Sequence, residues 1–136
     1  MALNEFVTMP KGVILFAEDH SIAAFVLKNQ LLDLGYLPIR VNNGKEIIDK
    51  LEKAAPDFTP DIILLDYHMP VLNAEETIAK LRETRLYDHI PIIILTGDDL
   101  DLIPEKLIEQ GAAAVMIKPV KPEVLQEQIT ILLNRA

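Results

Sequence analysis

Short aliphatic segments recur along the chain and alternate with longer segments in which apolar residues follow a helical period. The central one, residues 62–65, is an unbroken apolar run between Pro60 and Pro70. A run of this kind is typical of a strand buried on both faces of a parallel sheet. The predicted strands cover residues 13–17, 37–41, 62–65, 92–95 and 114–117.

Each predicted strand is followed by a predicted helix. In the first helix the apolar residues that broadly follow helical spacing are Ile22, Phe25, Val26, Leu32 and Leu34. We assign the isoleucine and leucine stripes of the helices to the core. Residues 43–46 and 73–76 have the spacing of a capping box, and Ser21 or Asp19 is expected to cap the first helix. Glycines in the position that ends a helix are Gly35 and Gly111.

Alternating strands and helices imply a parallel sheet covered on both faces, with right-handed crossovers. The predicted fold class is therefore α/β: a flavodoxin-like, doubly wound sheet of five parallel strands in the order 2-1-3-4-5, with five helices. Residues 1–11 show no period and are expected to form a leader. Residues 12–136 are expected to form one domain, without a repeat or a linker to a second one.

The composition of the chain excludes several classes of function. The formal net charge of −8 argues against direct binding of nucleic acid through phosphate neutralisation. The absence of cysteine excludes disulfides, thiolate metal sites and cysteine nucleophiles. No apolar run approaches the roughly 20 residues that span a bilayer, and no secretory signal is visible. We therefore expect a soluble, cytoplasmic protein without membrane insertion.

Acidic residues follow two of the predicted strands at the point where the strand order reverses. Ligands bind at the carboxyl ends of the strands near such a point. The order 2-1-3-4-5 puts Glu18, Asp19 and Asp66 beside one another there, with Thr96 and Lys118 at the same edge of the sheet.

Three carboxylates in one crevice repel one another. Two of them about 4 Å apart cost about 4 kcal/mol at an effective dielectric constant of about 20. Either one carboxylate is protonated or a cation relieves the repulsion. Oxygen ligands without thiolate or an imidazole cluster favour a hard ion, Mg²⁺ before Ca²⁺ or Mn²⁺.

A cation site of this kind leaves room for a phosphoryl oxygen. Lys118 offers a positive charge and Thr96 a hydroxyl donor, both of which suit a transferring phosphoryl group. Asp66 can then act as the nucleophile and form an aspartyl phosphate. No Ser–His or Cys–His alternative is evident in the sequence.

Four segments together resemble the signature of a known family. They are Ala-Glu-Asp at 17–19, Leu-Leu-Asp-Tyr-His-Met-Pro at 64–70, Leu-Thr-Gly at 95–97 and Lys-Pro at 118–119. Each is weak alone, but in this order and spacing they look like the receiver domain of two-component response regulators, the CheY-like family. The resemblance covers nearly the whole chain, from about Gly12 to Leu133.

The resemblance implies a metal-assisted phosphoacceptor. Asp66 would take a phosphoryl group from a phosphohistidine on a histidine kinase or a histidine phosphotransfer protein. Glu18, or more directly Asp19, would hold Mg²⁺ together with Asp66 and the backbone carbonyl of His68. Such a protein assists its own phosphorylation and dephosphorylation and is not an enzyme.

The resemblance also implies how the signal leaves the site. Lys118 would pair with one phosphoryl oxygen and Thr96 with another, and the Lys118–Pro119 peptide would be cis. Phosphorylation would draw Thr96 towards Asp66 and change the surface formed by residues 101–110, 114–117 and 122–134. A downstream protein or an output domain would read that change.

Three features depart from the family pattern. Val115 stands where the family has an aromatic residue that swings inward, so no aromatic switch is expected there. Residues 72–74 read Leu-Asn-Ala instead of Met-Asp-Gly, so the loop is expected to lose access to a left-handed conformation. His68 and Asp98 occupy positions at which the family tunes phosphorylation rates.

Several alternatives stay open. The chain could be a degenerate receiver that only docks, or the receiver fragment of a hybrid histidine kinase. A phosphohydrolase of the haloacid dehalogenase kind would need a second acid where His68 stands. A flavodoxin relative would bind a phosphate at the first loop, where Glu18 and Asp19 repel one. A monomer and a weak dimer are both compatible with the sequence.

Overall fold

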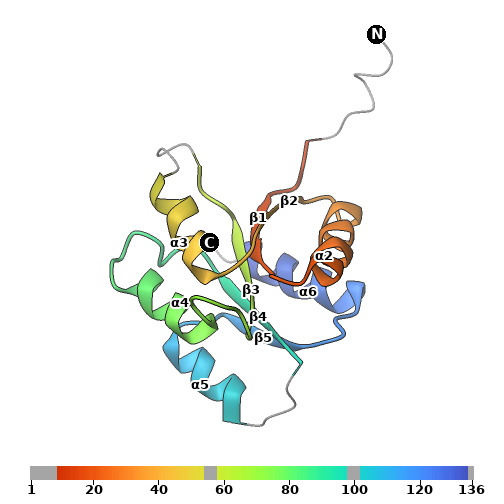
Figure 1. Cartoon of the computed structure of the whole chain (residues 1–136). Helices are drawn as coiled ribbons and strands as arrows, with labels where there is room; N and C mark the ends of the chain where they lie inside the picture. Colours follow the sequence, from red (N-terminus) through yellow and green to blue (C-terminus); the bar gives the residue numbers. More distant parts are fainter. Residues whose placement is uncertain (1–8, 54–57, 98–101, 135–136) are drawn as a thin grey trace.

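The computed structural model describes residues 9–53, 58–97 and 102–134. Five strands and five helices alternate along the chain (Figure 1). In order they are β1 (Val13–Ala17), α2 (Ser21–Asp33), β2 (Leu37–Val41), α3 (Gly44–Lys53), β3 (Ile62–Asp66), α4 (Ala74–Arg82), β4 (Ile92–Thr96), α5 (Leu102–Gln110), β5 (Ala114–Ile117) and α6 (Pro122–Leu133). The predicted strands are confirmed to within one residue at each end.

The strands form one parallel sheet in the order β2-β1-β3-β4-β5. The predicted doubly wound topology is therefore confirmed. The chain reverses its winding between β1 and β3, which lie side by side with Ala17 opposite Leu65. This reversal places the carboxyl ends of both strands next to each other.

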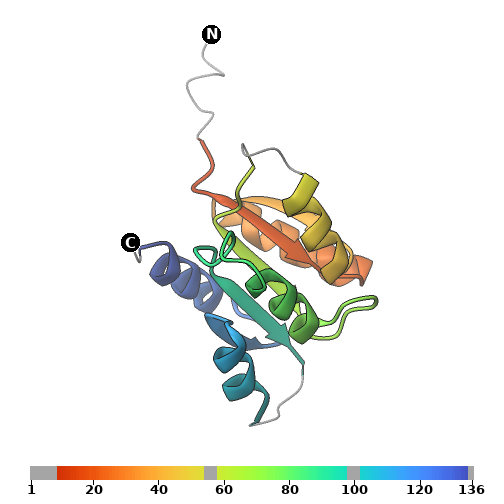
Figure 2. The same ribbon diagram turned by 90° about the vertical axis from the view of Figure 1, so that its left-hand side faces the viewer.

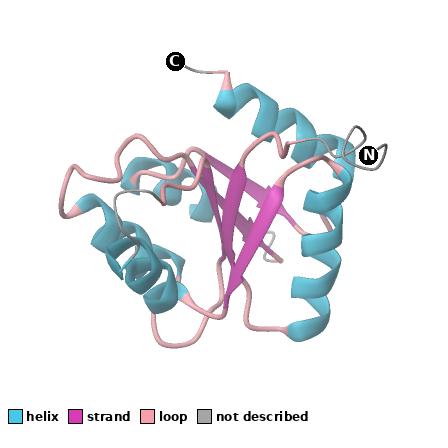
Figure 3. Ribbon diagram, turned by 90° about the horizontal axis from the view of Figure 1, so that it is seen from above, coloured by secondary structure: helices cyan, strands magenta, loops and turns pink. Residues whose placement is uncertain are grey.

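Side chains on the two faces of the sheet belong to separate clusters, because successive residues of a strand point to opposite faces. One cluster joins the sheet to α3, α4 and α5, and the other joins it to α2 and α6. Figure 2 shows α3, α4 and α5 following one another across their face. Figure 3, seen from above, shows helices on both sides of the strands. Leu64 and Leu65, neighbours on β3, are buried in opposite clusters.

Most predicted helix ends are confirmed. Asn73 and Glu76 form a complete capping box at the start of α4. Gly35 and Gly111 follow α2 and α5 with φ of 97° and 122°, a region that glycine enters without steric cost. The cap predicted for α2 is wrong: Ser21 is its first residue, and His20 Nδ1 accepts from the amide of Ala23 at 3.5 Å.

The outer face of α2 is the main departure from the predicted core. Ile22, which was assigned to the core, is 71% exposed. Phe25 and Val26, which share its helical spacing, are 67% and 50% exposed. The helix packs through Ala24, Leu27 and Leu31 instead. The helix carries apolar residues on both faces, so spacing alone did not show which face meets the sheet.

The loop after β3 contains a strained residue. Val71 has a φ of 69°, and the amide of Leu72 donates to the carbonyl of Pro70 at 2.8 Å, which closes a three-residue turn. A β-branched residue rarely adopts positive φ. The expectation that the loop loses left-handed geometry is therefore wrong, because Val71 adopts it and Ala74 simply begins α4.

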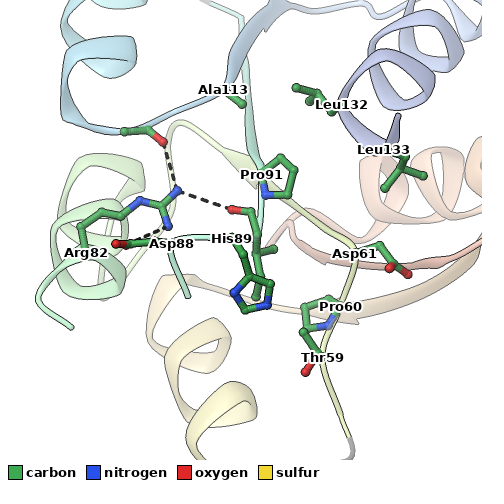
Figure 4. A pocket seen from close by; sticks show the side chains of 12 residues that line it. Thr59, Pro60, Asp61, Arg82, Asp88, His89, Pro91, Ala113, Leu132 and Leu133 are labelled. Carbon is green, nitrogen blue, oxygen red and sulfur yellow. Dashed lines mark hydrogen bonds and ion pairs between the residues drawn. The ribbon is translucent and has the colours of Figure 1, made fainter. Parts of the chain in front are cut away.

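Arg82, the last residue of α4, holds the end of the sheet at which β4 and β5 begin (Figure 4). Its guanidinium donates to the carbonyls of Tyr87 at 2.9 Å, Gly111 at 3.1 Å and Ile90 at 3.5 Å. It thereby joins α4, the loop before β4 and the turn after α5, beside a hollow of about 440 Å³. Within the described residues, none of the helices has the length and apolar character needed to cross a bilayer.

Candidate functional site

The carboxyl ends of four strands bring the predicted site residues to one edge of the sheet. Glu18 and Asp19 follow β1, while Asp66 ends β3 and Thr96 ends β4. Lys118 follows β5, and its amide donates to the carbonyl of Thr96 at 2.8 Å. These positions follow from the parallel register, in which Asp66 lies opposite Leu95 and Thr96 opposite Ile117.

The three acids form one cluster. Carboxylate oxygens of Glu18, Asp19 and Asp66 all lie within 4.8 Å of one another. Glu18 is buried, Asp66 is partly buried and Asp19 is exposed. The cluster therefore opens to solvent on the side of Asp19.

Lys118 is the cation of this cluster. Its Nζ donates to Asp66 Oδ1 at 2.7 Å and to Glu18 Oε1 at 3.1 Å. The other carboxylate oxygen of Glu18 accepts from the amide of His20 at 3.1 Å. Both oxygens of Glu18 are thus engaged, which leaves Asp19 and Asp66 better placed than Glu18 to accept a further cation.

The charges of Asp66 and Lys118 are compensated to different degrees. Burial raises the pKa of Asp66 above its ordinary 3.8; Glu18 and Asp19 add to the rise, and the hydrogen bond and charge of Lys118 only partly oppose it. Burial acts to lower the pKa of Lys118, but its hydrogen bonds to Asp66 and Glu18 outweigh burial and raise that pKa above 10.5. The ammonium is well compensated, whereas the ionised carboxylate of Asp66 is not.

This donor set fits a hard divalent cation. It offers carboxylate oxygens from three residues, and their negative charge exceeds the single positive charge of Lys118. Mg²⁺ is commonly bound by one or two carboxylates while it keeps several waters. Asp19 and Asp66 meet that requirement, with Glu18 beside them.

The remaining predicted positions lie around the cluster. Thr96 is almost fully buried, at 1% exposure. His68 is exposed and packs edge-on against the ring of Tyr67, with centroids 4.9 Å apart. Val115 is partly buried and packs against the core on the α3–α4–α5 face. Asp98 lies outside the described residues.

Two features beside the site escaped the sequence analysis. Arg40 on β2 donates from Nε to the carbonyl of Glu18 at 3.1 Å and from a terminal nitrogen to that of Asp19 at 3.4 Å. A lone arginine on an edge strand carries no signal of such a contact. A largely apolar hollow of about 390 Å³ also lies next to Lys118, between α2 and the loop after β5. The apolar residues of α2 were the available signal for that hollow.

The comparisons with known proteins agree with this geometry. A family model described as "Response regulator receiver domain" matches residues 14–130. The chain is 27% identical over 122 residues to the chemotaxis protein CheY1 of Helicobacter pylori, covering 89% of this chain and 96% of that protein. It is 29% identical over 125 residues to hybrid signal transduction histidine kinase D of Dictyostelium discoideum, covering 91% of this chain and 8% of that protein.

A solved receiver structure is similar to this chain in fold and in sequence. The receiver domain of the sensor histidine kinase PA1611 from Pseudomonas aeruginosa PAO1, with magnesium coordinated in its active-site cleft, shares 27% identity at a TM-score of 0.79. The match covers 90% of this chain and 97% of that domain. The chain therefore belongs to the response regulator receiver domain family and carries an acidic cluster consistent with a phosphoacceptor site.

Proposed function

We propose that this chain is a phosphoacceptor switch in which Asp66 takes a phosphoryl group from a phosphohistidine in an Mg²⁺-dependent reaction. The observation that carries the proposal is the arrangement around Asp66: two further acids within 4.8 Å and the ammonium of Lys118 at 2.7 Å. This arrangement combines a nucleophile, a cation site and a fixed positive charge at one edge of the sheet.

The transfer is a simple displacement. A carboxylate oxygen of Asp66 attacks phosphorus as the phosphorus–nitrogen bond of the donor breaks, and the electron pair of that bond stays on the imidazole nitrogen. Asp19 and Asp66, with the backbone carbonyl of His68, would hold Mg²⁺, which supplies charge to offset the phosphoryl oxygens. Lys118 would shift its hydrogen bond from Asp66 to a phosphoryl oxygen, and Thr96 would donate to another.

Phosphorylation would be signalled through a surface near Lys118 and Thr96, which lie at the ends of β5 and β4. Both lie beside a face made by α5, β5 and α6, where Ile108, Ile117 and Val124 are exposed around a hollow of about 660 Å³. Because Val115 is small, a shift of Thr96 would act through local repacking of this face instead of an aromatic swing. A partner or an output domain that prefers the shifted face completes the switch.

The donor would dock on α2. Its outer face carries the exposed apolar residues Ile22, Phe25 and Val26. Val26 also lines the hollow of about 390 Å³ that contains Lys118 and Glu18. A kinase or phosphotransfer protein with apolar residues around its phosphohistidine would bury this face while bringing phosphorus to Asp66. The donor would dock on α2 in the same way whether the receiver acts alone or within a hybrid kinase, since its relatives include both kinds.

Phosphorylation by a small donor tests the chemistry. Incubation with acetyl phosphate and Mg²⁺ should add one phosphoryl group by intact mass spectrometry, and the adduct should vanish with Asp66→Asn or with EDTA. An adduct that persists in Asp66→Asn would refute the assignment. A chain that takes no phosphoryl group would instead be a degenerate receiver that only docks. Turnover of a small phosphoester with continuous release of phosphate would contradict our proposal that the protein is not an enzyme.

Transfer from a protein donor tests the docking face. Ile22→Asp should slow transfer from a phosphorylated histidine phosphotransfer protein by about tenfold or more, yet leave labelling by acetyl phosphate unchanged. Leu86→Asp is the matched control, because Leu86 is as exposed as Ile22 but lies on the loop before β4. Equal effects of the two variants would contradict docking on α2.

A further inference from the structure

Arg40 lies on the face of the sheet that α2 covers. It is the fourth residue of the edge strand β2, opposite Phe16 of β1. Its side chain lines a hollow of about 260 Å³ between β2 and α2, together with Phe25 and Lys28. From there it reaches the loop that carries the first two acids of the site.

The guanidinium binds two successive peptide carbonyls. Nε donates to the carbonyl of Glu18 at 3.1 Å and a terminal nitrogen donates to that of Asp19 at 3.4 Å. The planar fork of arginine presents its donors in a fixed relation, which the single ammonium of lysine does not reproduce. Arg40 therefore constrains the orientation of both peptide planes at once.

The rest of the loop leaves Asp19 dependent on this contact. Glu18 is held from several sides: its amide donates to the carbonyl of Val41 at 3.1 Å, and its carboxylate is bonded to Lys118 and to the amide of His20. Asp19 is exposed, and its carbonyl is fixed by Arg40. The position of the Asp19 carboxylate relative to Asp66 thus depends on the fork.

Charge and positioning act in opposite directions here. A positive charge beside an acidic cluster weakens the attraction of that cluster for a divalent cation. A fixed loop strengthens cation binding, because ligands that are already oriented lose less entropy, and loss of an outer-shell contact typically weakens metal binding by about 10–100-fold. Removing Arg40 therefore tightens cation binding if its charge dominates and weakens cation binding if its positioning of the loop dominates.

We propose that Arg40 is a positioning residue for the cation site: its two hydrogen bonds hold the loop of residues 18–20 so that Asp19 and Asp66 bind the divalent cation together. This inference rests on the proposed function for the identity of the cation, Mg²⁺. The geometric part, that Arg40 orders the loop, holds without any metal.

The test uses the full chain with Arg40→Met, Arg40→Lys and the control Lys28→Met, which removes the same charge from the same hollow. In metal-free buffer, the amide of His20 should exchange with solvent at least about fivefold faster in Arg40→Met, with Ile47 of α3 unchanged as an internal reference. Unchanged exchange at His20 would overturn the proposal. Equal acceleration at Ile47 would also overturn it, since that marks a general loss of stability.

Magnesium affinity is the second readout. An NMR titration with MgCl₂ should show a Kd about tenfold higher in Arg40→Met, only partly restored in Arg40→Lys, and no weaker in Lys28→Met. Tighter binding by Arg40→Met would show that charge prevails and would overturn the proposal. The rate of labelling by acetyl phosphate should recover in Arg40→Met at saturating Mg²⁺, and failure to recover would also count against it.

The phosphoacceptor proposal and the Arg40 proposal can fail independently of each other. If the wild-type chain takes no phosphoryl group or binds no Mg²⁺, the phosphoacceptor proposal is wrong. The exchange rate of the His20 amide still decides, in that case, whether Arg40 orders the loop.

Discussion

Replacing Asp66 by asparagine should stabilise the protein in the absence of divalent cations. At the 4.8 Å limit within which the carboxylate oxygens lie, and with an effective dielectric constant of about 20, each neighbouring carboxylate repels that of Asp66 by about 3.5 kcal/mol. Lys118 at 2.7 Å attracts it by about 6 kcal/mol on the same scale. The two repulsions and the attraction nearly cancel, so the cost of burying the charge remains.

Asparagine keeps an acceptor for Lys118 and removes that cost. We expect the free energy of unfolding of Asp66→Asn in EDTA at pH 7 to exceed that of the wild type by about 1–2 kcal/mol, or about 4–8 °C in Tm. Urea denaturation followed by circular dichroism measures the difference. Asp49→Asn is the control with the opposite sign, since the hydrogen bond from Lys45 holds the pKa of Asp49 below 3.8 and its loss should not stabilise.

The pH dependence has a definite sign. Because folding raises the pKa of Asp66 above 3.8, mainly through burial, the native state retains its proton to higher pH than the unfolded chain. The wild type loses stability relative to Asp66→Asn as pH rises through the folded pKa, and the two converge below pH 3.8. Mg²⁺ at ten times its Kd should stabilise the wild type by about 1.4 kcal/mol and Asp66→Asn by less. An asparagine variant that is less stable than the wild type at pH 7 in EDTA would refute the reasoning.

Three further expectations concern Lys118, Arg82 and Val71. Lys118→Met should lower the free energy of unfolding by about 2 kcal/mol below pH 10.5, where the ammonium is charged. It should also tighten Mg²⁺ binding in a titration, because the ammonium no longer competes with the cation for the carboxylates of Asp66 and Glu18. Arg82→Met should lower the free energy of unfolding by about 2–3 kcal/mol in urea denaturation, since it leaves the carbonyls of Tyr87, Ile90 and Gly111 without their donor, and Arg82→Lys should recover only part of it. Val71→Gly should raise the free energy of unfolding by about 0.5–1 kcal/mol by relieving the positive φ of 69°, whereas Leu86→Gly, also exposed, should not.

The order of strands and the composition of the site could be predicted from local sequence. Runs such as residues 62–65 have no polar side because both faces of a central parallel strand are buried. The residue after such a run reaches the carboxyl edge, so Asp66, Thr96 and Lys118 had to converge once the strands were parallel. The capping box at residues 73–76 and the helix-ending glycines were equally readable, because their hydrogen bonds join residues only a few positions apart. The box predicted at residues 43–46 is only half formed, since the Glu46 carboxylate accepts from the amide of Asn42 instead of Asn43.

Contacts between distant residues were decided by the tertiary structure alone. The apolar residues of α2 follow a helical period on more than one side, and only packing through Leu27 and Leu31 left Phe25 outside. The fork of Arg40 reaches a loop more than twenty positions earlier, across the register of β1 and β2. Burial of Asp66, which sets the direction of its pKa shift, likewise depends on neighbours brought together from four strands. Sequence determined which chemical groups meet at the edge of the sheet; folding determined how they are held and charged, because those properties depend on distances that no local pattern encodes.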